Sequence, residues 1–140
     1  MDIKEFKKYI IKYLIEKHNF IYKNNLLYKE YKDFFFVIDI IYSKFGYYKI
    51  FYNYSIKKLH NERVLIDYDV QIGRDLQSPD NVFNKEFLTK ISYKDLNGIL
   101  NKTFQIITLL EKKGIKYIYK YDKDIMFDKS REFLESVIKN

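Results

Sequence analysis

A carboxylate within the most apolar part of the chain is the first residue that could do chemistry. Asp39 lies in a run of aromatic and branched aliphatic residues between Phe34 and Tyr42. A buried carboxylate must be paired or protonated, so Asp39 either marks a functional site or bonds to a neighbour. Lys49, Tyr47 or a backbone group at a sheet edge could supply that bond, and both interpretations stay open.

A Gly-Arg pair after a predicted strand is the second feature of this kind. Arginine occurs three times in 140 residues, and Arg74 directly follows Gly73. Segments at strand ends often present functional groups, whereas an exposed ion pair of Arg74 with Asp69 or Asp75 would contribute little. We therefore count Arg74, together with Asp69 and Gln71, among the candidate binding residues.

The aspartates of residues 67–75 superficially resemble a calcium-binding loop. The sixth position of the loop is Ile72 and the twelfth is Ser78, where the calcium template requires glycine and a bidentate glutamate. The alternation is better explained as the solvent-facing side of a strand. We predict no metal site here.

Two enzyme hypotheses stay open as the least favoured ones. Glu30 and Lys32 have the acidic-x-Lys spacing of metal-dependent nucleases, and Asp39 is the nearby acid that such a site would need. A metal-dependent hydrolase would instead combine Asp39 with Asp67 and Asp69.

Composition removes most other catalytic chemistry. The chain has no cysteine and two histidines, His18 and His60, which excludes thiolate nucleophiles and multi-histidine zinc sites. It has four glycines and none of the glycine-rich nucleotide-binding or nucleophile-elbow motifs. We predict no catalytic residue and no cofactor, and we assign His18 a structural role at a helix end, where a cation complements the helix dipole.

The net charge of +7 favours an anionic partner less than it first suggests. Residues 1–60 carry 12 lysines against six acids. The abundance of Lys, Ile, Tyr, Phe and Asn is typical of A/T-rich coding, which places lysine at solvent positions by default. Arginine supplies the bidentate fork for phosphates and bases, and its scarcity makes nucleic-acid binding the less favoured alternative.

Hydrophobic periodicity predicts one α+β domain over residues 1–140. It comprises an N-terminal helix, an antiparallel sheet of four to five strands, and C-terminal helices packed on one face. The predicted strands are 20–23, 26–31, 33–43, 47–57 and 64–72, and the predicted helices are 2–18, 78–88, 92–114, 115–119 and 129–139.

The predicted strand 47–57 has two chemically different faces. Its apolar face carries Tyr48, Ile50, Tyr52, Tyr54 and Ile56, and its mixed face carries Tyr47, Lys49, Phe51, Asn53 and Ser55. Aromatic and polar residues of this kind suit interfaces. Together with Asp39, we take Lys49, Phe51 and Asn53 as candidate binding residues on a surface that the helices leave free.

Four segments resemble a bacterial family called domain of unknown function 4304. They are residues 4–8, residues 37–43, residues 53–56 and the strand with its Gly-Arg pair at 70–74. The family tends to have Gln at the position of Ile41 and a His just before the Gly-Arg segment. The resemblance implies a small α+β domain and brings no established activity.

We expect a soluble cytoplasmic domain without a membrane segment, because no long apolar run is present. The leading functional hypothesis is a non-enzymatic domain that binds another protein, in an accessory or immunity-type role or as a homodimer. Nucleic-acid binding through the lysine-rich N-terminal region and exposed aromatic rings is the alternative.

Overall fold

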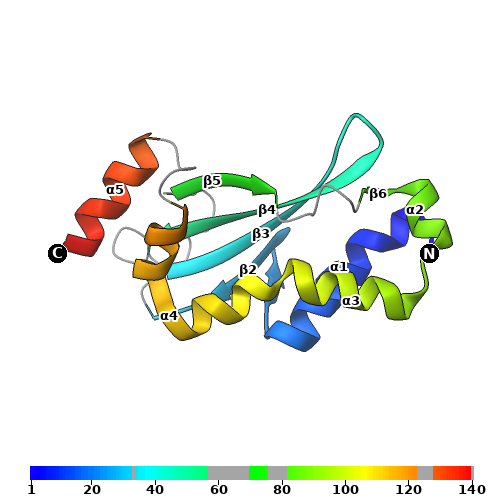
Figure 1. Ribbon diagram of the computed structural model, residues 1–140, viewed down its shortest axis with the longest axis horizontal. Helices are drawn as coiled ribbons and strands as arrows, with labels where there is room; N and C mark the ends of the chain where they lie inside the picture. Colours follow the sequence, from blue (N-terminus) through cyan, green and yellow to red (C-terminus); the bar gives the residue numbers. More distant parts are fainter. Residues whose placement is uncertain (33, 57–69, 76–81, 123–127, 140) are drawn as a thin grey trace.

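The computed structural model of the chain describes residues 1–32, 34–56, 70–75, 82–122 and 128–139, and it has the predicted α+β architecture. Its elements are α1 (Ile3–His18), β1 (Ile21–Lys23), β2 (Leu26–Glu30), β3 (Phe34–Tyr42), β4 (Tyr47–Ile56), β5 (Val70–Asp75), β6 (Phe83–Asn84), α2 (Lys85–Lys90), α3 (Tyr93–Thr103), α4 (Gln105–Asp122) and α5 (Asp128–Lys139). The strands form one antiparallel sheet in the order β1-β2-β3-β4-β5, with β6 also paired to β4 (Figure 1).

Tight turns set the register of the two N-terminal hairpins. Asn24 and Asn25, between β1 and β2, both have positive φ angles, 53° and 62°. A two-residue hairpin turn requires such angles in order to match the twist of the two strands. Gly46 has a φ of 89° in the turn between β3 and β4. Both turns lie between strands that the sequence predicts, 20–23 and 26–31, and 33–43 and 47–57.

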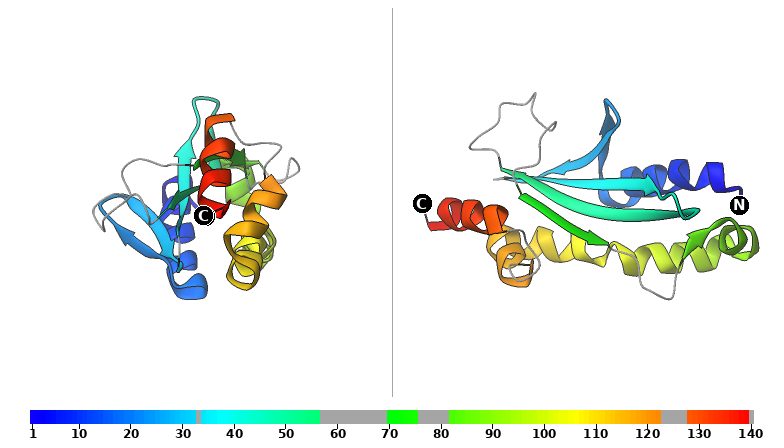
Figure 2. Two further views of the ribbon diagram at one scale, coloured as in Figure 1. Left: turned by 90° about the vertical axis from the view of Figure 1, so that its left-hand side faces the viewer. Right: turned by 90° about the horizontal axis from the view of Figure 1, so that it is seen from above.

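β3 is the central strand and its even-numbered residues form the core. It pairs with β4 from Phe34↔Ile56 to Tyr42↔Tyr48, and its other edge pairs with β2. The core residues contributed by the sheet and helices include Phe36, Ile38, Ile50, Tyr52 and Tyr54 together with Phe6, Ile10, Leu14, Leu96, Leu100, Phe104 and Ile107. Helices α1, α3 and α4 therefore cover one face of the sheet, as Figure 2 shows.

Local capping explains where α1 and α3 begin. The Asp2 side chain accepts a hydrogen bond from Lys4 N (3.3 Å), and the Ser92 side chain accepts one from Asp95 N (3.1 Å). Such caps satisfy backbone donors that the first turn leaves free. Asn19 ends α1 in the left-handed conformation, with a φ of 59°.

The predicted long helix 92–114 is two helices. Phe104 leaves helical geometry (φ −94°, ψ 14°) and separates α3 from α4, while its ring is buried near Tyr13. Packing of this ring against α1 outweighs helix propensity, which is a weak local preference. Gly114 (φ 70°, ψ −167°) then interrupts α4 at the predicted helix end.

Two boundaries near the candidate residues differ from prediction. β5 continues through Gly73 and Arg74 to Asp75, so the Gly-Arg pair lies within a strand and not after it. The predicted helix 78–88 begins at Lys85 with Asn84 as its N-cap, because Phe83 and Asn84 instead pair with β4. Ser78 and residues 64–69 lie outside the described part of the chain.

None of the helices in the described ranges has both the length and the apolar character of a membrane-spanning segment. Helix α5 lies beyond the ends of the strands, near α4 and β5, and contributes the buried Leu134 to the core (Figures 1 and 2).

Candidate functional site

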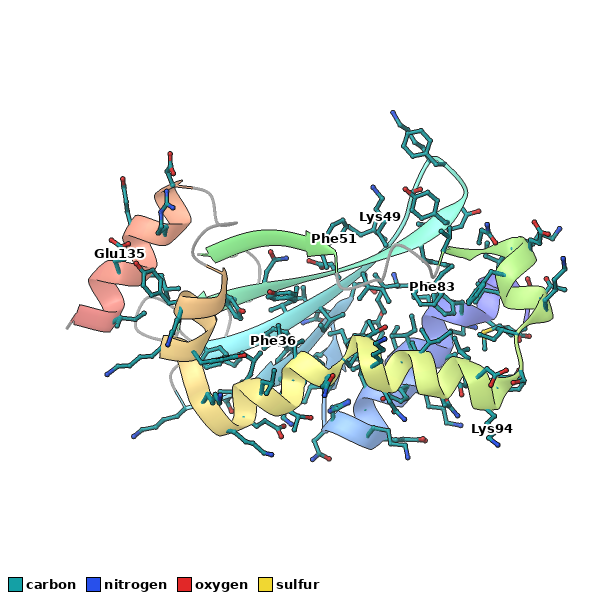
Figure 3. All side chains as sticks on the ribbon, viewed as in Figure 1. Phe36, Lys49, Phe51, Phe83, Lys94 and Glu135 are labelled. Atoms are coloured by element: carbon teal, nitrogen blue, oxygen red, sulfur yellow. The ribbon has the colours of Figure 1, made fainter. Side chains whose placement is uncertain are left out.

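The face of the sheet opposite the helices, here called the outer face, carries the odd-numbered residues of β3 and β4. They are Phe35, Val37, Asp39 and Ile41 on β3 and Tyr47, Lys49, Phe51, Asn53 and Ser55 on β4. Figure 3 shows Phe36 between the sheet and α4, whereas Lys49 and Phe51 lie on the side away from that helix.

One half of the outer face is buried. Phe35 and Val37 form a small apolar cluster with Leu26 and Tyr28 from β2. On β4 the Asn53 side chain is 7% exposed and Ser55 is fully buried. The expectation of an open surface that includes Asn53 is therefore wrong, since Asn53 and Ser55 are buried beside an apolar cluster of β2 and β3 residues.

Asp39 is held by an amide in this region. Asn53 Nδ2 donates to Asp39 Oδ2 over 2.8 Å, and Phe51 is the residue directly opposite Asp39 on β4. Sequence reasoning considered Lys49, Tyr47 and the backbone as partners of Asp39, and missed Asn53. An amide donor satisfies a half-buried carboxylate without a ligand.

The structure does not bring all predicted site residues together. Gln71 pairs with Asn53 on the outer-face register, whereas Arg74 pairs with Tyr52, a core position. A register shift between Tyr52 and Asn53 separates the two pairings. Asp69 lies outside the described residues.

The other end of the outer face is exposed and leads into the β3–β4 hairpin. Ile41 on the outer face and Phe45 in the turn are 50% and 71% exposed. Tyr42, on the opposite face of β3, is 53% exposed. We call these residues, with Lys44, Tyr47 and Lys49, the hairpin surface. The tip of this hairpin projects beyond the other strands (Figure 1).

Hydrogen bonds in the turn at the tip hold the backbone of Phe45. Ser43 N donates to Tyr47 O (2.8 Å) and Gly46 N donates to Ser43 O (3.1 Å), while Ser43 Oγ accepts from Phe45 N (3.1 Å). A short polar residue that bonds its own turn and a glycine with positive φ are the expected chemistry of such a turn. The aromatic ring is therefore displayed by a bonded turn.

Lysines cover two rings of the hairpin surface. Lys44 Nζ lies 5.3 Å from the centroid of the Phe45 ring, and Lys49 Nζ lies 5.7 Å from that of Tyr47. These are cation–π distances. No aspartate or glutamate occurs between residues 40 and 56, so the hairpin carries positive charge without an acid in its own sequence.

Tyr48 anchors the hairpin in the core. Its ring contacts Tyr42 (5.0 Å between centroids) and Phe6 of α1 (5.2 Å). Burial, with smaller contributions from Tyr42 and Asp2, raises the pKa of Tyr48 above its ordinary value of 10.0. The phenol therefore stays neutral at physiological pH and does not add charge to the hairpin.

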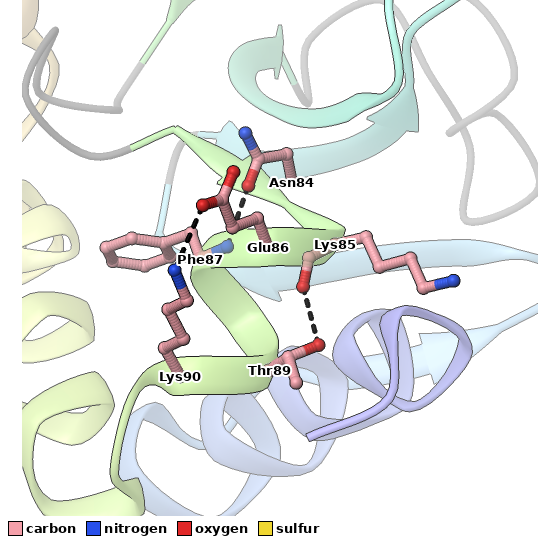
Figure 4. Close-up of polar contacts among 6 residues, drawn as sticks. All are labelled: Asn84, Lys85, Glu86, Phe87, Thr89 and Lys90. Atoms are coloured by element: carbon pink, nitrogen blue, oxygen red, sulfur yellow. Dashed lines mark hydrogen bonds and ion pairs between the residues drawn. The ribbon is translucent and has the colours of Figure 1, made fainter.

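A groove lies next to the base of the hairpin, where β6 meets α2. It measures about 440 Å³ and is lined by Val82, Asn84, Glu86, Phe87, Lys90 and Ile91. Its polar groups are engaged: Asn84 Oδ1 accepts from Phe87 N (2.8 Å), and Lys90 pairs with Glu86 (3.0 Å), as Figure 4 shows. Val82, Phe87 and Ile91 provide its apolar lining.

The proposed nuclease carboxylates are too far apart for one ion. Glu30 is opposite Phe35, and Asp39 lies four residues farther along β3, a span of roughly 13 Å at the rise of a strand. Ligand oxygens lie within about 2.6 Å of a shared cation. Among the described residues, no group of three His, Cys, Asp or Glu side chains is placed to hold a metal ion.

Part of the exposed site could have been found from the sequence. Phe45 stands between Lys44 and Gly46 in a four-residue turn, and such a turn has no room to bury a ring. The groove could not be found, because Val82 and Phe83 were predicted to lie within the helix 78–88, whereas Phe83 pairs with β4.

Comparison of the chain with family models, with curated proteins and with solved structures found no match.

Proposed function

We propose that the chain is a non-enzymatic protein-binding domain and that the hairpin surface is its contact site. The observation that supports this proposal is the exposure of Ile41, Tyr42 and Phe45 on one projecting hairpin. Isolated exposed apolar residues are common on protein surfaces. Clustered ones with basic residues among them are typical of interaction sites.

Desolvation of exposed rings favours binding at this hairpin. Aromatic residues contribute much binding energy when a partner covers them, and they dominate the binding energy of many interfaces. A residue whose backbone is already held by a bonded turn loses little backbone entropy on binding. Phe45 is such a residue, since Ser43 and Gly46 hold its backbone.

Photo-crosslinking tests the proposal in cells that naturally produce the chain. The variant Phe45→p-benzoylphenylalanine places the reactive group on the hairpin surface, and Tyr93→p-benzoylphenylalanine places it at a comparably exposed position (56%) on α3. We expect a discrete protease-sensitive adduct from position 45 that position 93 does not give. An adduct of twice the chain mass identifies a second copy as the partner. Identical products from both positions, or none from position 45, would contradict the proposal.

Nucleic-acid binding is the second candidate function, and the cation–π pairs of Lys44 and Lys49 favour it. Lysines beside aromatic rings occur in grooves that bind single strands. Against it, these lysines cover ring faces that a base would need for stacking. The test is anisotropy of a labelled dT12 oligonucleotide at low salt, where non-specific binding is strongest. A nuclease-sensitive adduct at Phe45 with tight dT12 binding would replace protein binding by this function.

A further inference from the structure

The groove and the hairpin surface form one continuous surface. β6 pairs with the base of the hairpin through Tyr47↔Asn84 and Tyr48↔Phe83. Asn84, which lines the groove, is thus directly opposite Tyr47 of the hairpin surface, and Val82 of the groove lining is 41% exposed. A ligand that contacts the hairpin would therefore reach the groove without crossing the sheet.

The groove suits an apolar side chain. Its volume lies within the range of small-molecule pockets, roughly 300–1,000 Å³, and Val82, Phe87 and Ile91 supply its apolar contacts. Glu86 and Lys90 at its rim neutralise one another, and the Asn84 carbonyl oxygen caps α2. Asn84 Oδ1 and the Glu86–Lys90 pair keep these partners when an apolar side chain enters the groove, which lowers the cost of covering them.

The charge of the hairpin surface points to an acidic ligand. Lys44 and Lys49 flank the exposed rings, residues 40–56 contain no acid, and the whole chain carries +7. Complementary charge steers association and fixes register at an interface.

From these three features we propose that the partner is an acidic polypeptide segment whose apolar residue occupies the groove while its carboxylates meet Lys44 and Lys49. This inference rests on the proposed protein-binding function and adds the chemistry of the partner. A polypeptide fits better than a nucleic acid because Val82, Phe87 and Ile91 in the groove and Ile41 on the hairpin surface offer apolar contacts, which a hydrated sugar-phosphate chain does not use.

The test uses the full chain and a phage-displayed library of random 12-residue peptides. We expect the enriched peptides to be rich in Asp and Glu and to share one large apolar residue. A representative peptide should bind the double variant Lys44→Glu/Lys49→Glu at least about tenfold more weakly, as expected for loss of charge complementarity. The matched control Lys102→Glu/Lys112→Glu changes the net charge equally at exposed lysines of α3 and α4, and it should bind within about twofold of the native chain.

Two further comparisons separate the parts of the inference. Val82→Asn removes an apolar contact without changing the charge. It should therefore weaken binding of the enriched peptide, but not binding of a version of that peptide whose apolar residue is replaced by Ser. Enriched peptides without acidic character, equal loss in both lysine variants, preference for dT12, or failure to enrich any peptide would overturn the inference. If crosslinking at Phe45 still yields a protein adduct, these outcomes reject the acidic partner while the protein-binding function stands.

Discussion

Phe45, which we propose binds a partner, and Phe36, which lies in the core, should differ in their effect on stability. Phe36 is fully buried in contact with Tyr52 and Tyr54 of β4, whereas Phe45 is 71% exposed. Full burial of a phenylalanine contributes about 1.5–3 kcal/mol, so less than a third of that, below about 1 kcal/mol, is at stake in Phe45→Ala. Phe36→Ala removes a core ring and leaves a cavity, which costs about 3–5 kcal/mol.

Urea unfolding followed by far-UV circular dichroism measures both variants against the native chain. Phe45→Ala should leave the midpoint and the m-value almost unchanged, with a melting temperature at most about 4 °C lower. Phe36→Ala should lower the free energy of unfolding by several times as much. The same Phe45→Ala protein should lose capture of the partner identified by crosslinking, which Tyr93→Ala should retain.

A loss of more than about 2 kcal/mol in Phe45→Ala would refute this reasoning, since so large an effect requires a buried ring. The hairpin would then be covered in the free protein, by a second copy or by another part of the chain. Sedimentation at several protein concentrations would distinguish these two cases, because only the dimer would make the loss depend on concentration.

Three further predictions concern stability. Gly98→Ala in α3 should raise stability by about 1 kcal/mol, because an added Cβ meets nothing within 4 Å. Gly114→Ala should lower stability by about 1–3 kcal/mol, because a φ of 70° with a ψ of −167° suits glycine alone. Thermal melts of both variants check that the two changes have opposite signs. The Tyr31 hydroxyl is buried without a hydrogen-bond partner among the described residues, so Tyr31→Phe should match or exceed native stability by up to about 1 kcal/mol, and a clear loss would reveal a partner. Burial, followed by the effect of Lys29, lowers the pKa of His18 below 6.5 against a smaller raising effect of Glu111. The unfolded chain then takes up the proton first, so stability falls as the pH drops below 6.5, and His18→Gln should flatten this part of the stability profile.

Local signals predicted the elements that depend on neighbouring residues. The Asn24-Asn25 turn, the caps at Asp2 and Ser92, and the two faces of β4 are all set within a few residues of sequence. Elements that depend on distant partners were missed. β6 is two residues long, and it exists because Tyr47 and Tyr48 offer a free strand edge.

The same distinction explains the outcome for the site. Period-two alternation placed Lys49, Phe51 and Asn53 on one face, which the pairing with β3 supports. The alternation predicts on which face of the sheet a residue lies, but it does not predict whether other residues bury that face. Asn53 is buried and bonded to Asp39, whereas Phe45 is exposed. Similarly, the sequence predicted a charged His18 at the helix end. In the structure, burial and the nearby Lys29 both lower the pKa of His18.

A structural explanation of the hairpin accounts for Tyr48 but leaves the exposed residues without a role. Holding β6 and closing the core against Phe6 require Tyr47 and Tyr48, which the strand pairing and ring contacts already occupy. Neither task needs large apolar side chains at Ile41 or Phe45, where polar residues would keep the turn and lower the risk of aggregation. The Ser43 and Gly46 bonds would form equally well with a polar residue between them. The excess of apolar and basic groups at the tip is therefore the part of this fold that packing does not explain, and the proposed contact with another molecule would explain it.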